Sequence, residues 1–236
     1  MPDFPKRNPR LQDRDFEILE HVMRYRITTP EVLHQLFFAD CDRNAVTKVT
    51  SRLCTQQFLA SYPLYGSNVY FALGKNGARV VGLQARHVKP LGPQAIYREF
   101  GTLAYCCLNG TLREKLRVRD ITKHFPALAA RRIDSSHYYL DREGEATRLA
   151  YIWVEGGGAV DHIVRTVRDD IIEERRRIPA LNQEIEASKF VVAVVTMTVD
   201  KREAIIAALR ALVTPVFFRV EVVSELIHLL PSVRHG

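Results

Sequence analysis

The chain of 236 residues lacks the features that mark membrane-spanning and secreted proteins. Its apolar runs all fall short of the roughly 18 residues that a membrane span requires. The opening residues, Met-Pro-Asp-Phe-Pro-Lys-Arg, contain no apolar core of a signal peptide. The sequence also has no internal repeat and no low-complexity tract. We therefore expect a soluble, cytoplasmic protein that makes no contact with a membrane.

Cysteine is scarce as well, and the four residues present form no CxxC pair. Cys106 and Cys107 are adjacent, so they cannot easily close a disulfide or hold one zinc ion together. The histidines show no metal-binding spacing such as HExxH, and no serine or cysteine stands in a nucleophile-elbow pattern. The sequence therefore predicts no metal site, no cofactor and no catalytic nucleophile.

Positive charge is what the chain has in excess, with a formal net charge of +7. Residues 1–90 hold 13 Lys and Arg against 8 Asp and Glu, whereas residues 91–236 hold 21 against 19. The smaller part thus carries +5 and the larger part +2. An excess concentrated in this way indicates a polyanionic partner for the amino-terminal part.

Three short helices are predicted in this amino-terminal part. The first runs from Asp13 or Asp15 to Arg26, with apolar residues at steps of three and four. The second begins with Thr29 as its cap and Pro30 in the first helical position. Its predicted inward-facing residues are Val32, Leu33, Leu36 and Phe37. The third spans Arg43 to Gln57, and its predicted buried stripe is Val46, Val49 and Leu53.

Two strands follow these helices, at residues 58–62 and 68–73, and the turn residues Gly-Ser-Asn lie between them. A short helix after Gly74 ends near Leu83, and residues 84–93 look like a linker. The order helix, helix, helix, hairpin is typical of a winged helix-turn-helix, which lays its third helix in the major groove of DNA.

The outward face of the third helix carries small, polar and basic residues. Asn pairs with adenine, Arg and Lys with guanine or phosphate, and Ser and Thr with either. The predicted DNA-contacting residues on this helix are Arg43, Asn44, Thr47, Lys48, Ser51 and Arg52. Tyr65 and Ser67 at the wing tip, with Lys75 and Arg79, are candidates for contacts to the DNA backbone. The alternatives are an ordinary solvated helix face, or a winged helix that binds another protein.

The remainder of the chain alternates strands and helices. Predicted helices cover residues 94–108, 159–177 and 201–212, and predicted strands cover 136–140, 149–155, 190–198 and 216–223. The continuous apolar sequence at 190–198 is expected of a strand buried on both faces. We therefore predict an α/β fold, α+β over the whole chain: a winged helix-turn-helix at residues 1–88 and an α/β domain with a small central sheet at residues 89–236.

Several stretches resemble the replication-relaxation family of bacterial and plasmid proteins. They are Asp-Phe-Glu-Ile-Leu-Glu-His-Val at 15–22, Arg-Tyr-Arg at 24–26, Leu-Phe-Phe at 36–38, and Tyr-Phe-Ala-Leu-Gly-Lys-Asn-Gly-Ala-Arg at 70–79. The resemblance covers residues 11–83 well and the rest loosely. It implies a winged helix followed by an α/β domain related to the PD-(D/E)xK nuclease superfamily, with a role in plasmid replication and relaxation.

A nuclease of that superfamily carries Asp at one strand end and Asp/Glu-x-Lys on the next strand, where the carboxylates hold Mg²⁺. The candidates are Asp134, after Ile133, and Glu155. Either Trp153 stands where a carboxylate is required, or Gly157 stands where the lysine is required. The sequence therefore favours an inactive domain used for dimerisation or partner binding, and a Mg²⁺-dependent nuclease remains the alternative.

Two further patterns have structural explanations. Glu155-Gly156-Gly157-Gly158 matches neither phosphate-loop motif, so we interpret it as a tight turn. The acids at 169–170 and 173–174 lie beside three arginines at 175–177, which favours a salt-bridged helix face over a carboxylate site. The predicted function is double-stranded DNA binding without catalysis, as a transcriptional regulator or a plasmid or mobile-element replication factor that acts as a homodimer or with a protein partner.

Overall fold

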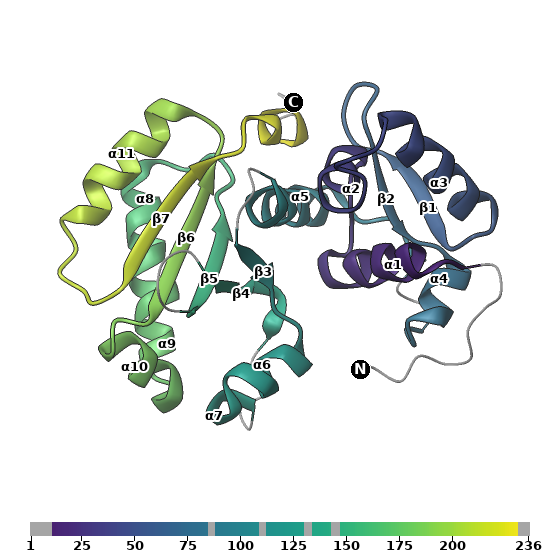
Figure 1. Cartoon of the computed structure of the whole chain (residues 1–236). Helices are drawn as coiled ribbons and strands as arrows, with labels where there is room; N and C mark the ends of the chain where they lie inside the picture. Colours follow the sequence, from purple (N-terminus) through teal and green to yellow (C-terminus); the bar gives the residue numbers. More distant parts are fainter. Residues whose placement is uncertain (1–10, 85–87, 109–111, 130–133, 143–146, 231–236) are drawn as a thin grey trace. The chain divides into compact units, whose positions relative to one another are not determined.

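The chain folds into a mixture of helices and strands (Figure 1). A computed structural model describes residues 11–84, 88–108, 112–129, 134–142 and 147–230. These residues belong to two compact units, one up to Leu103 and the other from Ala104 to Leu230. The division falls inside helix α5 (Pro93–Cys107), later in the chain than the boundary that the sequence placed after residue 88. Within the described ranges, every helix is too short or too polar to cross a membrane.

Three helices, α1 (Asp13–Tyr25), α2 (Pro30–Phe37) and α3 (Arg43–Thr55), form the first part of the amino-terminal unit. The predicted cap of α2 is confirmed, because the Thr29 hydroxyl accepts a hydrogen bond from the backbone N–H of Val32. Their core is apolar, and it includes Ile18, Leu19, Val22, Leu33, Val46 and Leu53. One prediction is wrong: Leu36 is 45% exposed and does not face this core.

An antiparallel hairpin of β1 (Leu59–Pro63) and β2 (Val69–Leu73) follows α3. The segment between α1 and α2 pairs with its other edge, because Thr28 and Phe71 exchange backbone hydrogen bonds of 2.9 and 2.8 Å. Helix α4 (Lys75–Val80) then packs against the hairpin and the core. The hairpin is therefore held to the helical part by hydrogen bonds to β2 as well as by the covalent chain.

The second unit is built on a five-stranded sheet in the order β3-β4-β5-β6-β7. The strands are β3 (Arg113–Lys115), β4 (Tyr138–Asp141), β5 (Arg148–Val154), β6 (Phe190–Thr196) and β7 (Phe217–Val222). The pairs β3–β4 and β4–β5 are antiparallel, whereas β5–β6 and β6–β7 are parallel. Every residue of β6 is buried, as its apolar sequence predicts.

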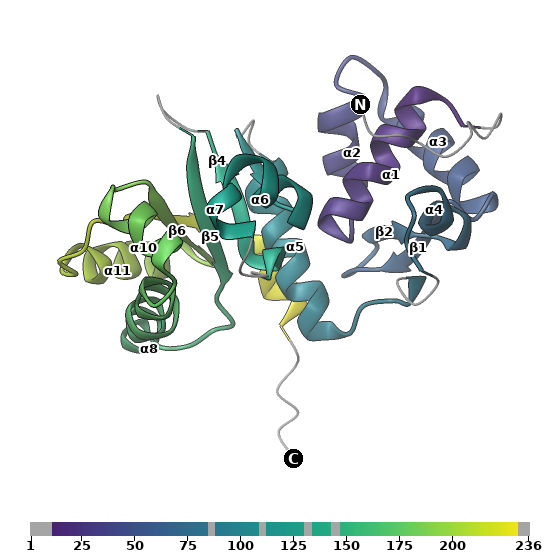
Figure 2. The same ribbon diagram turned by 90° about the horizontal axis from the view of Figure 1, so that it is seen from below.

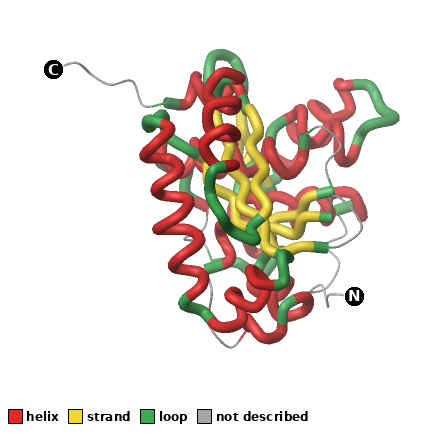
Figure 3. The backbone as a smooth tube through the Cα atoms, turned by 90° about the vertical axis from the view of Figure 1, so that its left-hand side faces the viewer, coloured by secondary structure: helices red, strands yellow, loops and turns green. Residues whose placement is uncertain are grey.

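Helices cover one face of this sheet (Figures 2 and 3). They are α8 (Val160–Arg165), the π-helical segment η3 (Thr166–Glu173), α9 (Glu174–Arg176), α10 (Pro179–Glu186) and α11 (Val199–Arg210). Their apolar residues share a core with the sheet. The helix predicted at 159–177 is thus present, but its middle has π geometry. Helices α6 (Val118–His124) and α7 (Pro126–Ala129), between β3 and β4, and the short 3₁₀ segments η2 (Ser135–His137) and η4 (Ser224–Leu229) complete the unit.

A buried histidine, His21, is expected to make the amino-terminal unit less stable in acid. Burial, followed by the charge of Arg24, lowers the pKa of His21 from 6.5 to about 3. The unfolded chain therefore takes up a proton at His21 below its ordinary pKa, and the folded unit does not. Between pH 7 and pH 5 this difference should lower the free energy of unfolding by about 2 kcal/mol.

The measurement is urea unfolding followed by amide hydrogen exchange in α1, at pH 7 and at pH 5. The variant His21→Gln, which does not titrate, should lose clearly less stability over the same interval. An equal loss in the variant and the wild type would assign the acid sensitivity to other groups.

Candidate nucleic-acid interface

The outward face of α3 brings together five of the six residues that the sequence proposed for it. Arg43, Asn44, Thr47, Lys48 and Ser51 are all exposed. On the opposite side of the helix, Val46, Thr50 and Leu53 are buried against the unit. The Asp42 carboxylate accepts a hydrogen bond of 2.8 Å from the backbone N–H of Asn44 and so fixes the start of the helix. The polar face therefore lies opposite a face that packs against the unit.

Arg52, the sixth residue, has a different environment. Its guanidinium donates a 2.7 Å hydrogen bond to the Asp15 carboxylate on α1, and its side chain is only 33% exposed. Asp15 is buried, and its second oxygen accepts a hydrogen bond of 2.8 Å from the backbone N–H of Gln12. Arg52 is thus engaged inside the unit, which the sequence did not predict, because its partner lies 37 positions earlier.

A hollow of about 570 Å³ lies between α2 and α3. Two of the predicted DNA-contacting residues, Arg43 and Thr47, form part of its lining. Helix α2 contributes Glu31 and Gln35, two exposed polar residues that are not among the predicted DNA contacts. The polar surface on α3 therefore extends across the turn onto α2.

Helix α4 is attached to the carboxyl-terminal end of α3. The backbone N–H of Asn76 donates to the Gln57 carbonyl, and its side-chain amide donates to the Gln56 carbonyl, both at 2.9 Å. These bonds satisfy carbonyls at the end of a helix, where the helix itself provides no donor. Lys75 and Arg79 are exposed on α4. The start of α4, which carries Lys75, is consequently held at the end of α3.

The two candidate residues at the tip of the turn between β1 and β2, Tyr65 and Ser67, have different environments. Ser67 is exposed, whereas Tyr65 is half-buried. The ring of Tyr65 meets that of Phe100 edge to face, with 6.2 Å between the ring centroids. Gly66 adopts φ +54°, a conformation that glycine tolerates best. Ser67 is therefore available to an external partner, and Tyr65 is partly occupied by packing.

The two nuclease candidates lie in unlike surroundings. Asp134 is exposed and accepts a 2.9 Å hydrogen bond from the backbone N–H of Ser136. Glu155 is fully buried at the end of β5. Ile133, named with Asp134 in the sequence, lies outside the described residues.

Both oxygens of Glu155 are occupied. The Thr196 hydroxyl donates to one at 2.8 Å, and the backbone N–H of Gly157 and the Lys201 ammonium donate to the other at 2.7 and 2.9 Å. Lys201 was not a candidate, because it comes from α11, 46 residues away. Glu155 thus fixes the glycine-rich turn. In the described part of the chain, no group of three or more His, Cys, Asp or Glu side chains could hold a metal ion.

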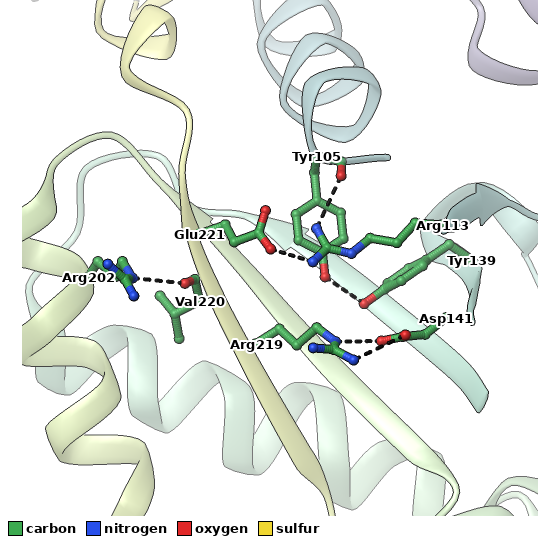
Figure 4. A network of polar contacts seen from close by, with 8 residues as sticks. All are labelled: Tyr105, Arg113, Tyr139, Asp141, Arg202, Arg219, Val220 and Glu221. Carbon is green, nitrogen blue, oxygen red and sulfur yellow. Dashed lines mark hydrogen bonds and ion pairs between the residues drawn. The ribbon is translucent and has the colours of Figure 1, made fainter. Parts of the chain in front are cut away.

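A polar network lies on one face of the sheet (Figure 4). Asp141 on β4 is fully buried and accepts two hydrogen bonds, of 2.5 and 3.1 Å, from Arg219 on β7. Arg113 on β3 pairs with Glu221 on β7 and stacks over the Tyr105 ring at 3.9 Å. Pairing between strands places Ala150 and Ala193 on the same face. These small side chains leave room for the ion pairs to cross the middle strands.

Two phenols complete the network. The hydroxyl groups of Tyr105 and Tyr139 lie 2.8 Å apart. Burial raises the pKa of Tyr105 and of Tyr139 well above the ordinary value, so both stay neutral at physiological pH. The ion pairs and the phenol pair thus link β3, β4 and β7 with the end of α5.

Comparison of the chain with protein families, curated proteins and solved structures finds no match. The geometry of α3 and its surroundings therefore carries the functional argument.

Proposed function

We propose that the amino-terminal unit is a winged helix-turn-helix that binds double-stranded DNA. Helix α3 enters the major groove, and the β1–β2 hairpin lies beside it as the wing. The observation that carries the proposal is the face of α3: five exposed polar or basic residues with no acidic side chain along the helix. Asn44 is suited to adenine, and Arg43 and Lys48 are suited to guanine or phosphate.

The charge of the chain supports the same proposal. Residues 1–90 carry a net charge of +5, and Lys75 and Arg79 extend the positive surface beyond the end of α3. Phosphate contacts of this kind supply most of the non-specific affinity for DNA. One winged helix contacts few base pairs, so the second unit would add affinity by forming a homodimer or by binding a protein partner.

The cellular role follows from the resemblance of residues 11–83 to the replication-relaxation family. We propose a role in transcription regulation or in the replication of a plasmid or mobile element. The second unit would be a nuclease-like domain without activity. Its buried Glu155, bonded by Thr196, Gly157 and Lys201, supports this proposal because its oxygens are already engaged.

The test is the double substitution Arg43→Ala with Lys48→Ala. Duplex affinity should fall more than tenfold at moderate salt. The slope of log affinity against log salt should become shallower by about 1 to 2, because each lost phosphate contact contributes about 0.9. A gel-shift titration over a range of salt concentrations, with duplexes selected from a random pool, measures both quantities.

The control is Arg210→Ala, which removes an exposed charge from α11 in the other unit. Its affinity and slope should match those of the wild type. Equal binding by the wild type and the double variant would refute the assignment of this face. Failure of the wild type to bind any duplex would instead favour a module that binds protein.

A further inference from the structure

The ion pair between Arg52 and Asp15 joins the last turn of α3 to the first turn of α1. The Arg52 guanidinium lies 2.7 Å from an Asp15 oxygen, and the Asp15 side chain is 2% exposed. Asp15 also accepts the backbone N–H of Gln12 and is therefore fixed in place at the start of α1. A carboxylate buried to this degree depends on its partners, because a buried charge without compensation is costly.

We propose that Arg52 is a positioning residue: its pair with Asp15 sets the rotation of α3 and so the direction of the DNA-contacting face. This inference rests on the proposed function. Arg52 follows Lys48 by four positions, so the two residues occupy the same side of the helix, one turn apart. Holding Arg52 against α1 consequently fixes where Lys48 and Ser51 point.

The sequence suggested a different role, in which Arg52 contacts DNA directly, at a base in the groove or at a flanking phosphate. The two roles give opposite results when the charge of Asp15 is removed. If Arg52 binds phosphate, Asp15 competes with the DNA, and Asp15→Asn should strengthen binding and steepen the salt slope by about 0.9. If Arg52 positions α3, the same substitution loosens the helix and weakens binding.

The experiment compares the wild type, Asp15→Asn and Lys48→Met in the full chain. Asparagine retains an oxygen that can accept the Gln12 N–H, so the start of α1 is preserved. We expect Asp15→Asn to weaken duplex binding about fivefold with an unchanged salt slope. Lys48→Met, the phosphate-contact reference, should make the slope shallower by about 0.9. Circular dichroism confirms that each variant is folded.

Amide hydrogen exchange of the free protein provides a readout without DNA. Asp15→Asn should speed exchange in α3, and Lys48→Met should leave that rate unchanged. Tighter binding with a steeper slope in Asp15→Asn would overturn the inference, and so would an unaltered exchange rate in α3. If the wild type binds no duplex, the proposed function fails, and the exchange rates still decide whether this pair holds α3.

Discussion

The substitution Asp141→Asn is expected to lower the free energy of unfolding of the second unit by about 3 kcal/mol. The Asp141 carboxylate is fully buried, and both of its oxygens accept hydrogen bonds from Arg219. Asparagine keeps the size of the side chain but leaves the guanidinium without its counter-charge. Removing one member of a buried ion pair lowers the stability more than replacing both members by apolar residues, because the remaining charge is poorly solvated.

Urea denaturation followed by tryptophan fluorescence measures this effect. The chain has a single tryptophan, Trp153 on β5, which packs against the core of the second unit. The control is Glu114→Gln, since Glu114 pairs with Arg142 at 2.8 Å on the surface. Loss of that exposed pair should cost less than about 1 kcal/mol. Similar losses in both variants would show that burial does not govern the Asp141–Arg219 pair.

Gly77→Ala should destabilise the amino-terminal unit by about 3 kcal/mol, near the upper end for overpacking. Within a helix, alanine is ordinarily more favourable than glycine by about 1 kcal/mol. At position 77 we expect the opposite, with alanine less favourable than glycine. A Cβ on Gly77 would lie 2.0 Å from the Phe58 carbonyl oxygen, and a backbone atom between α3 and β1 cannot easily move. Helix α4 would have to separate from the hairpin.

The measurement is amide hydrogen exchange across α1 to α4 as a function of urea concentration. Gly92→Ala is the matched control, because a Cβ there meets nothing within 4 Å. That variant should be as stable as the wild type or slightly more stable, since alanine restricts the unfolded chain. If Gly77→Ala has wild-type stability, α4 does not pack as closely as described.

The local signals in the sequence are sufficient to predict α1, α2, α3 and the hairpin. Caps such as Thr29 and the three- and four-residue spacing of apolar side chains act over a few positions, so they are readable without the fold. The exposed face of α3 follows from the same spacing. Leu36 is the exception, because periodicity marks a face but does not determine whether a neighbouring element covers it.

The partners of charged side chains could not be predicted in this way. Arg52 pairs with Asp15 and Lys201 with Glu155, and in each case the fold brings together residues that are distant in the sequence. A basic residue on a helix looks the same in the sequence whether it faces DNA or a buried carboxylate. For this reason the sequence places Arg52 on the DNA face and gives no sign that Lys201 pairs with Glu155.

Short elements made of charged residues could not be predicted from the sequence either. Strand β3 has only three residues, Arg113–Lys115, and its alternation of charged side chains is not the apolar pattern expected of a strand. Arg113 and Lys115 are nevertheless buried. Their burial depends on partners from other strands and helices, which no local pattern reveals.

The Arg113–Glu221 pair has a mechanical consequence for the second unit. Strands β3 and β7 are the first and last of the sheet, yet these two side chains bond directly to each other. The pair thus links the two edge strands directly across one face of the sheet. Neither edge strand can leave the sheet without breaking this ion pair. We therefore expect the five strands to unfold together and not one at a time.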